Sequence, residues 1–261
     1  MSAVCFYMNN EMKKTDLRDG ERLDEVNRNI KLIQNPRGLL YGTDAYMLAS
    51  FMRKRPSDAA CELGAGSGII SLLAVSGEKV KSCTCIEIQE YFAELCERNA
   101  ELNNMSDRIS VICSDVREVN KSQHAGRYGV VFTNPPYMQS GNGKRNETDE
   151  KYIARHEVFG GIKDFIKCAA MLLAYGGYFY CVVRCDRLAD VFCDMRESGI
   201  EPKRLLFVHA TEKSEPSVAL VEGIRGGKMS LTVERPLFLS DSLTGEMTER
   251  AKFAYENLTF D

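Results

Sequence analysis

A short polar and aromatic stretch, Asn134-Pro135-Pro136-Tyr137, directly follows an apolar run at 130–132. A strand through the apolar run must end just before this stretch, because proline lacks a backbone N–H and restricts the residue before it. The turn then places an amide, two carbonyls and an aromatic ring at the end of a buried strand, where α/β sheets bind ligands. Asn134 Oδ1 and the Pro135 carbonyl can accept both hydrogens of an exocyclic amine, and the Tyr137 ring can stack on its plane. These three are the predicted catalytic residues; a proline-stiffened loop without chemistry is the alternative.

A second candidate site is the glycine turn Glu62-Leu63-Gly64-Ala65-Gly66-Ser67-Gly68, between a predicted strand at 59–63 and a predicted helix at 69–75. Glycines let the backbone approach a ligand closely, and a helix N-terminus favours an anion. The dinucleotide motif G-x-G-x-x-G needs its third glycine at position 69, which is isoleucine, and the lysine of a triphosphate-binding loop is missing. The predicted cofactor-binding residues of the turn are Glu62, Gly64, Gly66 and Gly68.

Two acidic residues follow at the ends of the next predicted strands. Glu87 ends the strand at 81–88, where an acid can accept both ribose hydroxyls of a nucleoside. Asp115 follows the strand at 109–113, where it can accept from an adenine amine. Each acid alone is typical of a solvated loop. Together with the glycine turn and Asn134, they predict an adenosine-containing cofactor whose reactive end points at Asn134.

The elements that position these residues alternate between strand and helix. Predicted strands lie at 59–63, 81–88, 109–113, 128–133 and 178–183, and predicted helices at 69–75, 89–102, 164–173 and 186–197. This order predicts an α/β fold with a mainly parallel sheet and helices on both faces. Strands at 205–209 and 218–224 predict an antiparallel edge hairpin, for a seven-stranded sheet in all, and 229–233 extends the edge or the tail.

The first 55 residues predict an extension that packs on this core. Residues 30–33 and 39–41 form a predicted hairpin around the turn Asn35-Pro36-Arg37-Gly38, and a helical pattern follows at 45–52. The predicted organisation is an N-terminal hairpin and helix at 1–55, a catalytic domain at 56–240 and a C-terminal tail at 241–261.

Composition limits the partners. The net charge of −3 gives no global signature of nucleic-acid binding, so a nucleic acid needs a local basic patch. The ten cysteines follow no apparent leader and lack paired C-x-x-C spacing, and the three histidines are scattered, so we expect a cytoplasmic protein with reduced thiols and no metal. No apolar run approaches the ~20 residues of a membrane span.

A long polar, basic segment at 138–161 follows the proline turn. Long loops in compact domains are commonly functional. The predicted substrate-binding residues in this segment are Lys144, Arg145, Lys151, Arg155 and His156.

Taken together, the glycine turn, Glu87, Asp115 and the Asn-Pro-Pro-Tyr turn resemble the S-adenosylmethionine-dependent amino-methyltransferases. Further segments are similar to the bacterial tRNA adenine-N6 methyltransferases that act on valine tRNA: Gln34-Asn35-Pro36 to Gly42-Thr43-Asp44-Ala45, Ala154-Arg155-His156-Glu157, and Gly226-Gly227-Lys228 before Pro236-Leu237. The resemblance spans about residues 17–239. It implies a Rossmann-like class I methyltransferase fold, S-adenosylmethionine as methyl donor with S-adenosylhomocysteine as product, and a tRNA substrate methylated by direct in-line transfer.

Other interpretations stay open at this point. The same chemistry could act on a protein glutamine amide, a DNA adenine or a guanine amine of ribosomal RNA. A nucleoside-binding regulator without turnover is a further alternative, which the intact Asn134 and Tyr137 disfavour. We expect a monomer or a weak homodimer.

Overall fold

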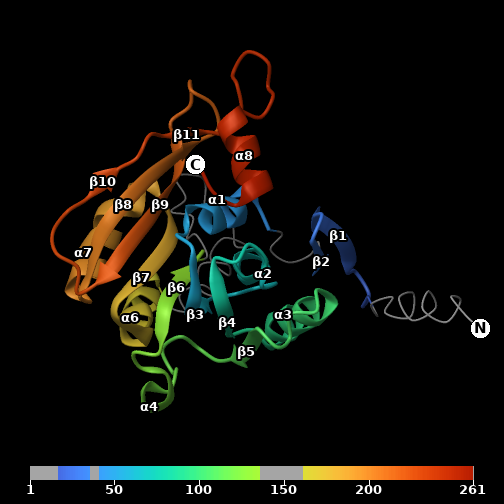
Figure 1. Cartoon of the computed structure of the whole chain (residues 1–261), viewed down its shortest axis with the longest axis vertical. Helices are drawn as coiled ribbons and strands as arrows, with labels where there is room; N and C mark the ends of the chain where they lie inside the picture. The colour runs from blue at the N-terminus through green and yellow to red at the C-terminus, as the bar shows by residue number, and fades with distance from the viewer. Residues whose placement is uncertain (1–16, 36–40, 136–160, 261) are drawn as a thin grey trace, which may run out of the picture.

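The computed structural model describes residues 17–35, 41–135 and 161–260. Its centre is a nine-stranded sheet in the order β10-β8-β9-β7-β6-β3-β4-β5, with β11 also paired to β8 (Figure 1). The strands are β3 (Arg55–Leu63), β4 (Val80–Glu87), β5 (Ile109–Cys113), β6 (Tyr128–Thr133), β7 (Leu173–Arg184), β8 (Ile200–His209), β9 (Pro216–Arg225), β10 (Thr232–Val233) and β11 (Leu237–Phe238).

The sheet confirms the predicted α/β fold. Strands β3 to β7 pair in parallel, whereas β9 is antiparallel to both β7 and β8. The predicted count of seven strands was too low, because β10 and β11 add two-residue strands parallel to β8. Strand β10 lies within the predicted edge extension at 229–233, whereas the two-residue strand β11 carries no alternating pattern that a sequence could reveal.

Helices cover both faces of the sheet, as predicted. They are α1 (Thr43–Phe51), α2 (Ile69–Ser76), α3 (Glu90–Leu102), α4 (Lys121–His124), α6 (Ile162–Leu172), α7 (Leu188–Glu197) and α8 (Glu249–Asn257), with a short 3-10 turn at Cys185–Arg187. Successive strand residues point to opposite faces. Phe132 therefore joins the core beneath α1, α2, α3 and α8, and its neighbour Val131 joins the core beneath α6 and α7.

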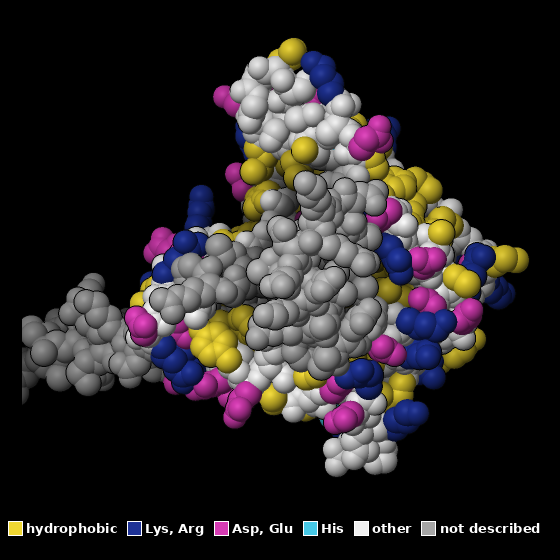
Figure 2. Space-filling view, turned by 180° about the vertical axis from the view of Figure 1, so that it is seen from behind, with side chains coloured by type: hydrophobic (Ala, Val, Ile, Leu, Met, Phe, Trp, Pro, Cys, Tyr) yellow, Lys and Arg dark blue, Asp and Glu magenta, His cyan; other side chains and the backbone are white. Residues whose placement is uncertain are grey.

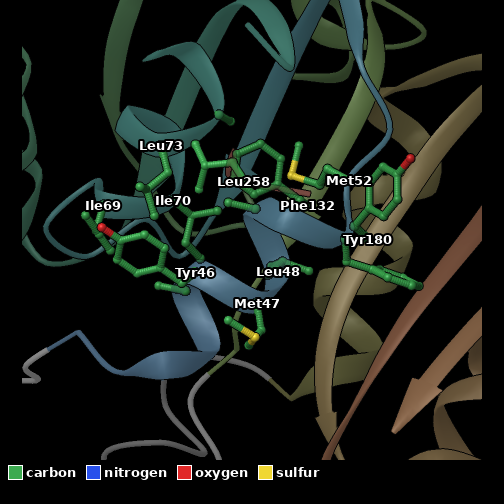
Figure 3. Packing of buried hydrophobic residues seen from close by; sticks show 14 of the residues in the cluster. Tyr46, Met47, Leu48, Met52, Ile69, Ile70, Leu73, Phe132, Tyr180 and Leu258 are labelled. Atoms are coloured by element: carbon green, nitrogen blue, oxygen red, sulfur yellow. The ribbon is translucent and has the colours of Figure 1, made fainter. Parts of the chain in front are cut away.

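Helix α1 packs at the centre of the core that contains Phe132. Figure 3 shows Met47 and Leu48 of α1, with Met52 just after it, packed near Phe132 of β6 and Tyr180 of β7. The predicted C-terminal tail contains α8, which packs on α1. Ser50 Oγ of α1 donates a hydrogen bond of 3.1 Å to the carbonyl of Ala254 in α8. The last described residues therefore belong to the same core as the sheet.

The N-terminal hairpin contains a strand that was not predicted. Strand β2 (Ile30–Gln34) pairs with β1 (Arg22–Asn27), which precedes it. The side chain of Asn27 closes the turn, because its Oδ1 accepts the N–H groups of Asn29 at 2.9 Å and Ile30 at 3.0 Å. Residues 36–40 of the predicted turn lie outside the described residues. The hairpin stands apart from the large sheet, on the side of α2 and α3 (Figure 1).

Across residues 17–35, 41–135 and 161–260, the structure contains no helix with the length and apolar character needed to cross a membrane.

Candidate active site

The strand registers bring the predicted site residues to one edge of the sheet. Leu63 at the end of β3 pairs with Ile86 of β4 and with Thr133 at the end of β6. Glu87, which follows Ile86, pairs with Cys113 at the end of β5. The glycine turn, Glu87, Asp115 and Asn134 therefore all leave the sheet at its carboxyl edge, where open α/β sheets bind ligands.

The glycine turn has a backbone that only glycine adopts easily. Gly64, Gly66 and Gly68 have φ angles of +69°, +54° and +78°, and Gly68 is the N-cap of α2. A Cβ atom on Gly68 would lie 2.4 Å from Cys96 Sγ of α3, whereas one on Gly66 would meet no described atom within 4 Å. Gly68 therefore faces the protein interior, and Gly66 leaves space for a ligand to approach the backbone.

Glu87 is held in place by the turn that it faces. Its carboxylate accepts the N–H of Gly66 at 2.9 Å and the N–H of Gln89 at 3.0 Å, and the residue is only 5% exposed. Burial raises the pKa of this carboxyl above its ordinary value. The side chain is thus a fixed acceptor beside the open side of Gly66, as a ribose with two adjacent hydroxyls requires.

Asp115 forms an ion pair with Arg117 that was not predicted from the sequence. Its Oδ1 accepts the backbone N–H of Arg117 at 2.8 Å, and its carboxylate also forms an ion pair with the Arg117 guanidinium. Hydrogen bonding from this guanidinium lowers the pKa of Asp115, so the carboxylate stays ionised near neutral pH. An adenine amine at Asp115 would have to share the carboxylate with Arg117, which is exposed at this edge.

Glu62 is turned away from the open side of the turn. It is 1% exposed, and its carboxylate accepts the backbone N–H of Ser71 in α2 at 3.0 Å as well as the Ser71 hydroxyl. Burial raises the pKa of this carboxyl well above its ordinary value. Glu62 anchors the first turn of α2 behind the glycines, so its predicted part in cofactor binding would be indirect.

The catalytic turn begins at the end of β6. Thr133 is fully buried, Asn134 is half-buried and Pro135 is buried. Thr133 Oγ1 donates a hydrogen bond of 2.8 Å to the carbonyl of Leu63, just before the glycine turn. The remaining predicted residues lie outside the described residues: Tyr137, Lys144, Arg145, Lys151, Arg155 and His156.

Two further residues shape this edge and were not predicted. Phe165 of α6 packs against the turn, since a Cβ on Gly64 would lie 3.1 Å from its ring. Asn99 of α3 is fully buried and donates a hydrogen bond of 3.0 Å to the Ser67 carbonyl within the turn. The sequence does contain one indication of this role: Asn99 is the polar residue among the otherwise apolar buried positions of α3.

The donor set fits an adenosine cofactor. Gly66 leaves room for a ligand beside the backbone. Along the same edge, the carboxylates of Glu87 and Asp115 can accept hydrogen bonds from the hydroxyl and amine groups of an adenosine. The family to which the sequence is similar indicates the reaction that such a cofactor would serve. A family model described as the methyltransferase small domain matches residues 41–191, more than half of the chain.

The chain belongs to this family. A methyltransferase small-domain protein is an S-adenosylmethionine-dependent enzyme. Two curated relatives carry the name tRNA1(Val) (adenine(37)-N6)-methyltransferase. The protein of Shewanella halifaxensis is 27% identical over 54% of this chain and 56% of its own length. The protein of Bacteroides fragilis is 25% identical over 69% of this chain and 75% of its own length.

Solved structures support the fold of this methyltransferase. A predicted O-methyltransferase from Agrobacterium tumefaciens superimposes with a TM-score of 0.67 at 22% identity, covering 83% of this chain and 97% of that protein. The predicted class I methyltransferase architecture is thereby confirmed. Within the described ranges, no group of three or more His, Cys, Asp or Glu side chains is arranged to hold a metal ion.

Proposed function

We propose that this methyltransferase transfers a methyl group to the exocyclic N6 amine of an adenine in tRNA, at the adenine 3′ of the anticodon of valine tRNA. One observation carries the proposal: Asn134 and Pro135 leave β6 beside the glycine turn, at a separation held by the bond from Thr133 to Leu63. The names of the two relatives support the choice of acceptor.

The proposed chemistry asks little of the protein beyond positioning. S-adenosylmethionine supplies an electrophilic methyl group on a sulfonium. An aromatic amine is a weak nucleophile because its lone pair is delocalised into the ring. Asn134 Oδ1 and the Pro135 carbonyl accept the two amine hydrogens, which favours a pyramidal nitrogen with a localised lone pair. Orientation and fixed dipoles then supply most of the rate enhancement.

No separate general base is needed in this proposal, because the alkylated nitrogen is strongly acidic and gives up its proton readily. Tyr137 is the residue expected to hold the target base out of its stack. Extrusion costs a few kcal/mol and less in a single-stranded loop. An adenine of the anticodon loop meets that condition.

Positive and negative side chains are mixed on the described surface, so we look for the RNA-binding charge in the predicted basic segment at 138–161. Figure 2 shows basic and acidic side chains interspersed on the face seen from behind. Several exposed cations near the carboxyl ends of the strands form ion pairs, among them Arg184 with Asp186 and Arg187 with Asp190. Mixed charge of this kind gives little attraction for a polyanion. We therefore propose that Lys144, Arg145, Lys151, Arg155 and His156 supply the RNA-binding charge, in a cytoplasmic protein that acts as a monomer or weak dimer.

The test uses unmodified valine tRNA transcripts. The protein is incubated with S-adenosylmethionine and the transcript, and the nucleosides are analysed by mass spectrometry. We expect N6-methyladenosine in the wild-type transcript and none when the adenine 3′ of the anticodon is replaced by guanine. Methylation of a glutamine peptide, DNA or ribosomal RNA, with none on the tRNA, would instead assign one of the alternative acceptors. Binding of the cofactor without turnover on any of them would favour a regulator.

A further inference from the structure

Helix α3 carries two asparagines one helical turn apart, and both contact strand β2. Asn99 Oδ1 accepts the N–H of Ile33 at 2.7 Å, and Asn99 Nδ2 donates to the Ile33 carbonyl at 3.1 Å. Asn103 makes the same pair of bonds with Lys31, at 2.9 Å and 2.7 Å. Ile33 and Lys31 are alternate residues of one strand. The two side-chain amides therefore satisfy the outer edge of β2 in the way that a neighbouring strand would.

The two amides differ in the target of their second Nδ2 bond. Asn103 Nδ2 also donates to the Asn99 carbonyl of its own helix at 2.7 Å, whereas Asn99 Nδ2 reaches the Ser67 carbonyl at 3.0 Å, between Gly66 and Gly68 of the cofactor turn. Asn99 is 0% exposed, so water cannot replace a bond that this amide loses. A single buried amide thus holds both the hairpin and the turn that carries the open side of Gly66.

Other polar contacts hold the hairpin end against α3. The Glu21 carboxylate pairs with Arg98 of α3 at 2.8 Å and accepts the Tyr91 hydroxyl at 2.9 Å. The Arg98 guanidinium lowers the pKa of Glu21 to about 2. These contacts attach the segment along the helix, but they do not reach the glycine turn. Asn99 is the described side chain that spans both.

We propose that Asn99 is a positioning residue that makes docking of the β1–β2 hairpin and binding of the cofactor mutually dependent. This inference rests on the cofactor assignment made above. A cofactor that orders the turn holds the Ser67 carbonyl in place, which fixes the Asn99 amide and therefore the edge of β2. By linkage, a docked hairpin strengthens cofactor binding by the same factor.

Hydrogen exchange with and without S-adenosylhomocysteine tests the coupling. In the wild-type protein, the ligand should slow amide exchange in the turn, 64–68, and also in the hairpin, 22–34. In Asn99→Asp, which keeps one acceptor and loses both donors, the ligand should still protect the turn but no longer the hairpin. Calorimetry should show a loss of affinity of about 3- to 10-fold, the scale of one hydrogen bond.

Asn103→Asp is the matched control, because it loses the Nδ2 bonds to the Lys31 and Asn99 carbonyls and leaves the bond from Asn99 to Ser67 intact. It should retain ligand-dependent protection of the hairpin and near-wild-type affinity. A merely structural role for Asn99 predicts instead that both variants lose stability while the ligand protects the hairpin equally in each.

Glu21→Gln keeps the proposal testable if Asn99→Asp does not fold. It loosens the hairpin from Arg98 without touching the turn, so hairpin exchange should quicken and the ligand should reverse that change. Ligand binding with no effect on hairpin exchange, in this variant or in the wild type, would overturn the coupling and leave the methyltransferase assignment standing. Absence of ligand binding would overturn the cofactor assignment itself.

Discussion

Thr133 Oγ1 donates a hydrogen bond of 2.8 Å to the carbonyl oxygen of Leu63, and both residues are fully buried. The two residues lie side by side in the register of β6 and β3. Leu63 precedes the cofactor turn and Thr133 precedes Asn134, so this bond joins the strands that carry the two halves of the site.

Replacing Thr133 by valine removes the hydroxyl and keeps the shape of the side chain. We expect Thr133→Val to lower the free energy of unfolding by about 1–3 kcal/mol, because the buried Leu63 carbonyl loses a hydrogen-bond donor. We also expect a lower kcat with little change in S-adenosylhomocysteine affinity, since the bond sets the distance between two turns rather than the shape of either. Chemical denaturation, calorimetry and single-turnover rates measure the three quantities.

Thr84→Val is the control for that substitution. Thr84 lies in the middle of β4, where its hydroxyl accepts from Ser110 at 3.3 Å. Its loss should leave the turnover of folded protein unchanged. Equal turnover in both valine variants would show that the Thr133 bond has no part in aligning the site.

Glu87 gives the cofactor site a pH dependence. Burial raises the pKa of this carboxyl above 4.5, and the ionised form is the one that accepts two hydroxyl hydrogens. The affinity for S-adenosylhomocysteine should therefore fall as the pH is lowered from neutral into the acid range where Glu87 becomes protonated. Because the pKa of Glu87 is higher in the folded than in the unfolded protein, its protonation at low pH stabilises the folded, ligand-free protein. The weaker binding at low pH is therefore not caused by unfolding that follows from protonation of Glu87.

Glu87→Gln separates the contribution of Glu87 from other groups. This variant should bind about 1–3 kcal/mol more weakly at neutral pH, and its affinity should be flatter across the same pH range. Calorimetry at several pH values is the measurement. Identical pH profiles for the wild type and Glu87→Gln would remove Glu87 from the cofactor contact.

The glycines of the turn should differ in their tolerance of alanine. Gly68→Ala places a Cβ 2.4 Å from Cys96 Sγ at a φ of +78°, so left-handed strain of about 1–2 kcal/mol adds to overpacking of about 1–3 kcal/mol. Gly66→Ala has the strain but no described atom within 4 Å of the new Cβ. Thermal unfolding should therefore show the larger loss for Gly68→Ala. Adding Cys96→Ala should restore part of that loss, and no restoration would contradict the clash.

The sheet was predictable because glycine, proline and strand-ending acids divide the sequence from residue 58 to residue 225 into regular units. The carboxyl ends of parallel strands share one edge, so the meeting of the glycine turn, Glu87 and Asn134 followed from their order. The direction of Glu62 did not follow, because it depends on whether Ser71 of α2 lies above the strand.

The features that were missed depend on partners far away in the chain. The bond from Ile33 to Asn99 was missed because the two residues lie 66 positions apart, and neither one's neighbours in the sequence indicate the contact. Helix α8 was missed because its buried contacts are two alanines, Ala251 and Ala254, which give a weak apolar stripe. Neither feature has a strong signal within its own segment.

Asn134 tests the central claim most directly, because it distinguishes catalysis at this edge from binding alone. Asn134→Ala should lower the single-turnover rate of N6-methyladenosine formation by ~100- to 1,000-fold, or about 2.7–4 kcal/mol, the scale of one oriented contact to a reacting group. Its S-adenosylhomocysteine affinity should change little. Asn134→Asp keeps an acceptor and should retain more activity than the alanine variant.

The rates are compared by quantifying N6-methyladenosine in valine tRNA, using enzyme samples matched for their folded fraction. We predict the order wild type, Asn134→Asp, Asn134→Ala, with cofactor affinity nearly constant across the three. An Asn134→Ala protein that has a lowered melting temperature and methylates at the wild-type rate would show that Asn134 only stabilises the turn, and would contradict its assignment as the catalytic residue.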